Sequence, residues 1–316
     1  MSFASETKNE LARITPEKKC CMLAEIAAYI RTAGSISIMG KYRINLNTDN
    51  AAVARHYKKL IQEYFSIETG LEIQEGGAVG KNRKNNKYSY SITIDSENKS
   101  EQILRECGIL MIREGYNYLS DGIYEGLVKS KCDKKAYLRG AFCGAGTMSD
   151  PNKYYDLEFV LNSEKLAADL KKLINSFADM EAKTVARAKK HVVYIKKADY
   201  ISDMLALMGA SNKVLEFEEI RIKKEIRSSD HRAINCDGAN ADRIVDASLR
   251  QVEAIRKIAE KSGLASLPDK LFELASLRLE HPEASISALG EMLDLPLKKS
   301  GVNNRLKKIE DIASKL

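Results

Sequence analysis

The sequence predicts an α+β protein in which a pseudo-symmetric, duplicated αββαββα domain is followed by an all-α module. Three observations lead to this fold class. Two similar segments lie 112 residues apart, and each is followed by alternating apolar patterns typical of strands. The pattern changes after about residue 218 and is helical from about residue 240. We expect the duplicated domain at 1–219, with halves at about 20–108 and 130–210, then a linker at 220–240 and a helical domain at 241–316.

The repeated segments, Ala24–Gly34 and Ala136–Gly146, both have the pattern of a helix that ends at glycine. Two glycines inside the second helix cost about 1 kcal/mol each relative to alanine, and close helix packing can offset that cost. We therefore expect the two helices to pack tightly against each other. The small residues at four-residue intervals are Ala24, Ala28 and Thr32 in the first segment and Ala136, Gly140 and Gly144 in the second.

Similar elements follow each helix, so the strands of both halves can join into one curved surface. The first half continues with strands at 35–38 and 42–46, a helix at 50–65, strands at 71–73 and 87–94, and a helix at 97–107. The second half has a strand at 155–161, a helix at 163–177, strands at 182–187 and 191–196, and a helix at 198–208.

Basic residues gather between the last two strands of each half. Neither residues 81–90 nor residues 183–197 contain an acid. Such hairpins either keep the chain soluble or follow a nucleic-acid backbone, and their matching places favour the second interpretation. The candidate phosphate contacts are Lys81, Arg83, Lys84 and Lys87 in the first hairpin and Arg187, Lys189 and Lys190 in the second.

The C-terminal module begins after a highly charged stretch, residues 221–243, which predicts an irregular linker or docking segment. An amphipathic helix at 240–262 follows, then helices at 268–279 and 286–293 and a last helix from Ser300. The expected buried residues are Ile244, Leu249, Val252, Ile255 and Ala259 in the first of these helices, and Val302, Leu306, Ile309 and Ala313 in the last.

The last two helices fit a helix-turn-helix, whose second helix enters the major groove of DNA. Residues 268–316 have no net charge, but residues 298–308 hold five basic groups and no acid. Arg and Lys can pair with guanine and Asn with adenine, although Lys307 and Lys308 could also serve only the helix dipole. The candidate DNA-binding residues are Lys298, Lys299, Ser300, Asn303, Asn304, Arg305, Lys307 and Lys308.

Composition excludes several other classes of protein. The 316 residues carry a net charge of only +7, and no apolar run reaches the ~18 residues of a membrane span. The six cysteines form no C-x2-C pair, so we expect neither a metal site nor a disulfide framework. The sequence contains no P-loop and no G-x-G-x-x-G, so we expect no cofactor, and the absence of a secretion signal predicts a cytoplasmic protein.

The repeated helices resemble the signature of LAGLIDADG homing endonucleases, at Ile26–Gly34 and Leu138–Gly146. In that family the acid before the final glycine holds the catalytic metal, and the matching residues are Ala33 and Ala145. Alanine offers no oxygen ligand, so we expect no catalytic residue and no enzyme activity, with an active homing endonuclease as a remote alternative. The nearby acids, Glu25, Asp49, Asp150 and Glu158, are expected to be surface or capping residues.

A degenerate LAGLIDADG repeat followed by a helix-turn-helix similar to sigma-factor region 4 resembles the WhiA family of transcription regulators. The stretches that carry this resemblance are Cys20–Glu25, Ile30–Ile36, Ala136–Phe142 and Lys299–Leu306. The resemblance implies a sequence-specific regulator of sporulation, cell-division or chromosome-segregation genes, associated with the nucleoid. It implies double-stranded DNA as partner, with other transcription factors or RNA polymerase as further candidates and no membrane. In the alternative, the N-terminal domain senses a protein or ligand, and only the helix-turn-helix binds DNA.

Overall fold

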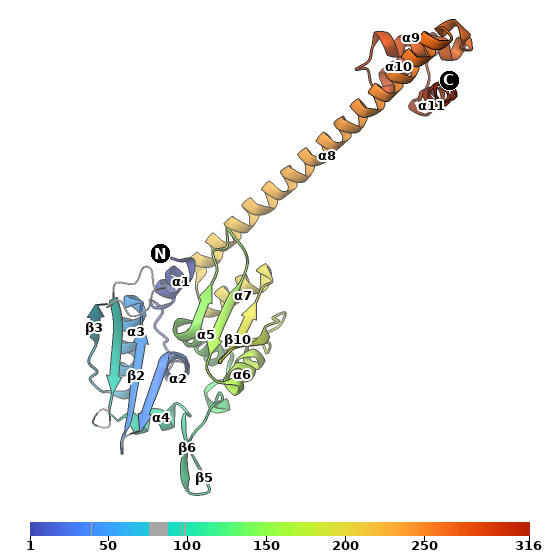
Figure 1. Ribbon diagram of the computed structural model, residues 1–316. Helices are drawn as coiled ribbons and strands as arrows, with labels where there is room; N and C mark the ends of the chain where they lie inside the picture. The colour runs from blue at the N-terminus through green and yellow to red at the C-terminus, as the bar shows by residue number, and fades with distance from the viewer. Residues whose placement is uncertain (39, 76–87, 96, 98) are drawn as a thin grey trace. The chain divides into compact units, whose positions relative to one another are not determined.

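A computed structural model of the chain describes residues 1–38, 40–75, 88–95, 97 and 99–316 (Figure 1). The chain divides into two compact units, Met1–Lys224 and Glu225–Leu316. Each unit has its own cluster of buried apolar residues. The predicted mixed α and β architecture followed by a helical module is confirmed.

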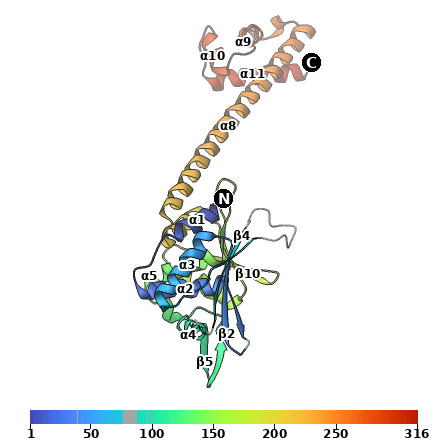
Figure 2. The same cartoon turned by 90° about the vertical axis from the view of Figure 1, so that its left-hand side faces the viewer.

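The N-terminal unit contains two four-stranded antiparallel sheets with equivalent strand orders, β1-β2-β4-β3 and β7-β8-β10-β9. The first half consists of α2 (Lys19–Ala33), β1 (Gly34–Ile38), β2 (Tyr42–Thr48), α3 (Ala51–Phe65), β3 (Glu72–Glu75), β4 (Tyr88–Ile94) and α4 (Ser100–Glu106). The second half consists of α5 (Lys131–Ala145), β7 (Gly146–Met148), β8 (Leu157–Leu161), α6 (Glu164–Ile174), β9 (Lys183–Arg187), β10 (Lys190–Ile195) and α7 (Ala198–Met208). Figure 2 shows β2, β4 and β10 along one side of this unit and α2, α3 and α5 along the other.

The signature helices α2 and α5 pack directly on each other, as the small residues predict. A Cβ atom on Gly140 would overlap the carbonyl oxygen of Glu25 and lie 2.9 Å from the Cβ of Ala28. A Cβ atom on Gly144 would overlap Thr32 Oγ1. The helix axes are therefore close enough that only glycine fits at both positions.

Several elements of this unit were not expected from the sequence. They are α1 (Phe3–Leu11), the hairpin of β5 (Leu110–Arg113) and β6 (Tyr116–Leu119), the short 3-10 helix η1 (Glu125–Leu127) and the short strand β7 that follows α5. The hairpin turns at Glu114 and Gly115, whose φ angles are +53° and +84°. Positive φ at both central residues is the geometry that lets a two-residue turn follow the twist of the strands.

A single helix, α8 (Ser211–Lys261), runs through the stretch predicted to be an irregular linker, so that prediction is wrong. Its first backbone amides are capped by α1, where the Glu10 carboxylate accepts from Asn212 N at 2.8 Å and Lys213 N at 3.1 Å. Along the helix, ion pairs one turn apart, such as Lys223 with Glu219 at 2.6 Å, support helical structure without an apolar face.

The C-terminal unit contains most of α8, from Glu225 onward, a short 3-10 helix η2 (Leu264–Ser266), α9 (Asp269–Glu280), α10 (Ile286–Met292) and α11 (Lys299–Ser314). Val302, Leu306, Ile309 and Ala313 are buried, as predicted. Within the described part of the chain, no helix is both long and apolar enough to cross a lipid bilayer.

The predicted inward face of α8 is correct at two of its five residues. Val252 and Ile255 are buried, whereas Ile244 and Leu249 are 56% and 57% exposed and Ala259 is also exposed. Ile244 and Leu249 belong to neither buried core: Phe217, earlier in the helix, packs in the core of the N-terminal unit, and the core of the C-terminal unit begins at Ile255.

Candidate nucleic-acid interface

The turn between α10 and α11 is fixed by backbone groups. Leu297 N donates to Gly290 O at 3.0 Å, and Asp294 N donates to the Glu273 carboxylate on α9 at 2.7 Å. Ser285 caps the start of α10 by accepting from Ala288 N at 3.1 Å. Helices α9 and α10 therefore fix the turn that leads into α11.

A buried arginine fixes the preceding turn, between α9 and α10. Arg278 Nη1 donates to Ala284 O at 2.7 Å and to Pro282 O at 3.3 Å. Ser248 on α8 donates to the same Pro282 oxygen. Burial lowers the pKa of the Arg278 guanidinium, a cost that its bonds to backbone carbonyls help to offset.

Gly290 permits the close approach of α10 to the turn that leads into α11. A Cβ atom there would overlap Leu297 O and lie 3.0 Å from Val302 Cγ2. We expect Gly290→Ala to lower the free energy of unfolding of this unit by about 1–3 kcal/mol, although alanine is the better helix former. Chemical denaturation followed by circular dichroism measures the change. The control is Gly301→Ala, where a Cβ would meet ordinary contacts at 3.6 Å, and equal stabilities of the two variants would contradict the prediction.

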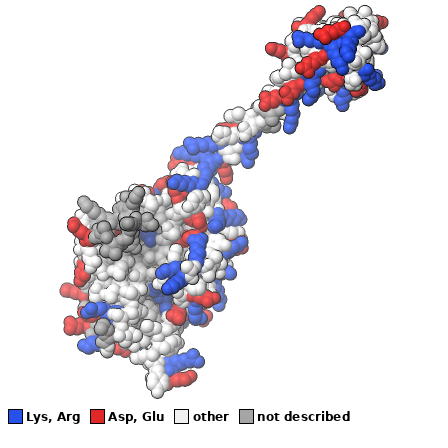
Figure 3. Space-filling model, viewed as in Figure 1, with Lys and Arg blue, Asp and Glu red and all other residues white. Residues whose placement is uncertain are grey.

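The face of α11 opposite its apolar residues is polar and basic. Six of the eight predicted DNA-binding residues are exposed, and Asn303 and Arg305 are half-buried. Figure 3 shows exposed Lys and Arg side chains among acidic ones on both units, in keeping with the small net charge. The exposed candidates are Lys298, Lys299, Ser300, Asn304, Lys307 and Lys308.

Arg305 has a structural contact that the sequence does not reveal. Its Nη1 donates to Lys270 O in the first turn of α9 at 3.2 Å. This bond uses one of the five guanidinium donors and directs the side chain towards α9. Arg305 therefore helps to hold α11, and Asn304, Lys307 and Lys308 are the better candidates for contact with DNA.

The structure describes the basic residues of the second hairpin but not those of the first. Lys81, Arg83, Lys84 and Lys87 lie outside the described residues. In the second hairpin, Arg187 forms a bidentate pair with Glu158 at 2.7 and 3.0 Å, which raises the pKa of Arg187 and balances its charge. Lys190 donates to Asn162 Oδ1, and Lys189 is exposed in the two-residue turn.

The positions that match the metal-binding acids of the LAGLIDADG signature carry no acidic side chain. Ala33 and Ala145 are the last residues of α2 and α5 and are half-buried. Among the described residues, one group of three metal-ligating side chains lies close together, and it is near the other ends of these helices.

Glu25 was expected at the surface, and that expectation is wrong. The carboxylate is fully buried between α2 and α5, where its Oε2 accepts from Arg139 Nε at 2.8 Å and Nη2 at 2.6 Å. His56 Nε2 lies 3.0 Å from Oε1. Although burial lowers the pKa of Arg139, the negative charge of Glu25 outweighs that effect and raises it overall.

The other nearby acids also have structural contacts. Glu158 pairs with Arg187, and Asp150 accepts from Asn152 N at 2.9 Å in a turn. Asp49 is exposed. Among the residues that the structure describes, none of these three acids lies with other ligating side chains in the arrangement of a metal site.

These features define a class of protein: a LAGLIDADG-like domain without its paired metal acids, in one chain with a helix-turn-helix domain. Three family models match the chain accordingly. They are the WhiA N-terminal LAGLIDADG-like domain at residues 19–110, the WhiA LAGLIDADG-like domain at 134–227 and the WhiA C-terminal HTH domain at 231–313. The chain belongs to the WhiA family.

Similar proteins match over the full length. A "Probable cell division protein WhiA" from Thermoanaerobacter pseudethanolicus is 45% identical over 318 residues, covering 100% of this chain and 98% of the relative. A protein of the same name from Alkaliphilus metalliredigens is 41% identical, with the same coverage. The crystal structure of full-length WhiA from Thermotoga maritima matches with a TM-score of 0.58 and 25% identity, covering 100% of this chain and 99% of that one.

Proposed function

We propose that this protein is a sequence-specific DNA-binding transcription regulator and that α11 is its recognition helix. The observation that carries the proposal is the division of α11 into two faces. Val302, Leu306 and Ile309 pack into the core, while Asn304, Lys307 and Lys308 face solvent. An asparagine can read adenine in the major groove, and lysines can contact phosphates or guanine.

We propose further that the N-terminal unit does not cleave DNA. Ala33 and Ala145 offer no oxygen ligands where the resemblance places the metal acids, and the buried Glu25 is already paired with Arg139. Robust Mg²⁺-dependent nicking of a supercoiled plasmid would contradict this part of the proposal.

The relatives named as probable cell division proteins support cell-division genes as targets. Sporulation and chromosome-segregation genes are the further candidates from the family resemblance. A regulator of this kind would act at the nucleoid, where other transcription factors or RNA polymerase could contact it.

DNA binding by α11 can be tested with duplexes selected from a random-sequence pool by the wild-type chain. We expect Lys307→Glu to weaken binding and to reduce the slope of log affinity against log salt by about 0.9, the share of one phosphate contact. Asn304→Ala should relax discrimination at one base pair by about 1–3 kcal/mol. Affinities follow from fluorescence anisotropy over a range of salt concentrations.

Lys315→Glu is the matched control, because Lys315 is exposed at the C-terminal end of the same helix. It changes the net charge equally but should leave the affinity nearly unchanged. Equal effects of Lys307→Glu and Lys315→Glu would contradict the assignment of the recognition face. Lys189→Glu in the same assay tests the second basic hairpin. A lower salt slope would indicate a phosphate contact, and an unchanged slope would leave the hairpin as a solubilising tip.

A further inference from the structure

The N-terminal ends of α2 and α5 bring together side chains that are far apart in sequence. Cys20 and Cys21 lie on α2, and the positions 112 residues later are Cys132 and Asp133 on α5. The duplication therefore places two pairs of metal-binding residue types opposite each other. The cysteine spacing within each half did not predict this cluster, because its members meet only across the two halves.

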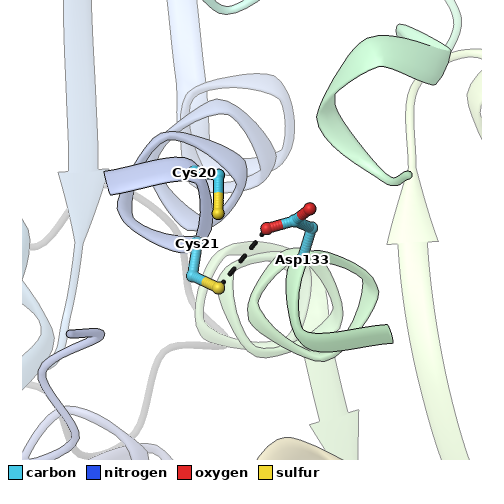
Figure 4. Close-up of side chains that lie close together, drawn as sticks. All are labelled: Cys20, Cys21 and Asp133. Atoms are coloured by element: carbon cyan, nitrogen blue, oxygen red, sulfur yellow. Dashed lines mark hydrogen bonds between the residues drawn. The ribbon is translucent and has the colours of Figure 1, made fainter. Parts of the chain in front are cut away.

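The geometry of the cluster is that of a nearly formed metal site. The thiol sulfurs of Cys20 and Cys21 and a carboxylate oxygen of Asp133 all lie within 4.8 Å of one another (Figure 4). Cys21 Sγ donates to Asp133 Oδ1 at 3.3 Å. Tetrahedral Zn²⁺ with ordinary Zn–S and Zn–O bonds separates its ligand atoms by about 3.6–3.8 Å. Small side-chain movements would therefore suffice to close the cluster around an ion.

The Asp133 carboxylate is already oriented for this role. Its Oδ2 accepts from Ser130 Oγ at 2.5 Å and from Ser130 N at 3.3 Å in the capping box of α5. Oδ1 is thereby directed towards the thiols. Hydrogen bonds of this kind from outside the ligand set orient ligating carboxylates in metal sites.

A further thiol and several basic residues lie beside the cluster. Cys132 lies next to Asp133 on α5 and contacts Ser130 Oγ at 3.0 Å, but its sulfur is not one of the three ligand atoms that lie within 4.8 Å of one another. The positive ends of two helix dipoles meet here, and Lys18, Lys19 and Lys131 flank the cysteines. The hydrogen bond with Asp133 raises the pKa of the Cys20 thiol, and burial raises the pKa of the Cys21 thiol, so an ion that binds here would displace the thiol protons.

We propose that Cys20, Cys21 and Asp133 form a binding site for Zn²⁺, in which the neighbouring Cys132 becomes the fourth donor when its side chain rotates. Cys21 and Asp133 are each only 7% exposed, and Cys20 is exposed, so an ion could enter from its side. Soft thiolate ligands favour Zn²⁺ over Mg²⁺ or Ca²⁺. The site would join the two halves at the ends of α2 and α5 opposite Ala33 and Ala145, and it is therefore separate from the position of a nuclease metal.

Co²⁺ titration of the full, reduced and chelator-treated chain tests the site. We expect a sulfur-to-cobalt charge-transfer band that saturates at one ion per chain and disappears when Zn²⁺ is added. Cys21→Ser should weaken binding by about 100-fold or more, because loss of a direct ligand should cost at least as much as loss of an outer contact, which costs 10–100-fold. Cys107→Ala is the control, since it removes a buried thiol from the core of the same unit.

Cys20→Ser provides a second variant in case Cys21→Ser does not fold, because Cys20 is exposed. It should also weaken binding strongly while circular dichroism stays unchanged. Absence of the charge-transfer band in the wild-type chain would overturn the proposal. Equal affinities of the Cys20→Ser and Cys107→Ala variants would overturn it as well.

Discussion

Replacing Arg139 with methionine is expected to lower the free energy of unfolding by about 3–5 kcal/mol, the usual cost of leaving one partner of a buried ion pair alone. Arg139 makes two contacts with Glu25 Oε2, at 2.6 and 2.8 Å, and the Glu25 side chain has no exposed surface. Methionine fills much of the same volume, so the loss would report mainly on a buried carboxylate that has lost its arginine and keeps its contact with His56. Chemical denaturation at neutral pH measures it.

Two controls isolate the charge. Lys135→Met removes a cation from the exposed face of the same helix and should change the stability by less than about 0.5 kcal/mol. Adding Glu25→Gln to Arg139→Met should recover much of the loss, because a neutral amide is cheaper to bury than an unpaired carboxylate. If the single and double variants were equally unstable, the ion pair would not be the cause.

Gly140→Val is expected to cost about 3 kcal/mol, near the upper end for an overpacked core. The first added carbon already overlaps the Glu25 carbonyl oxygen, and the two methyl groups would meet α2 at its contact with Ala28. Relief requires the two helices to separate, which would weaken the central contact of the N-terminal unit. Denaturant unfolding followed by circular dichroism measures the loss.

The matched control is Gly238→Val in α8, where an added Cβ has no neighbour within 4 Å. Valine is a slightly better helix former than glycine, so this variant should be neutral or slightly stabilised. The explanation from helix packing fails if Gly140→Val is as stable as Gly238→Val.

Local patterns in the sequence predicted the duplicated fold well. Alternating apolar residues identified β2 and β10, and the spacing of Val302, Leu306 and Ile309 identified the buried face of α11. These elements contact their surroundings through one regular face, so their periodicity is visible without knowledge of the partner.

The remaining features depend on contacts that no local pattern encodes. The central part of α8 has no apolar face, so its helical structure was missed. The pairing of Glu25 with Arg139, and of Cys20 and Cys21 with Asp133, requires the register between two helices from different halves. Applying the repeat offset of 112 residues to the cysteines could have found the cluster of Cys20, Cys21 and Asp133.

The buried ion pair also decides which helices can be partners. Glu25 and Arg139 are not repeat equivalents, since the positions that match them are Tyr137 and Ala27. Two copies of the first half, paired in the same manner, would enclose two carboxylates without an arginine, and two copies of the second half would enclose two arginines without an acid. Each half therefore favours its unlike counterpart, and the duplicated sequence excludes association of identical halves.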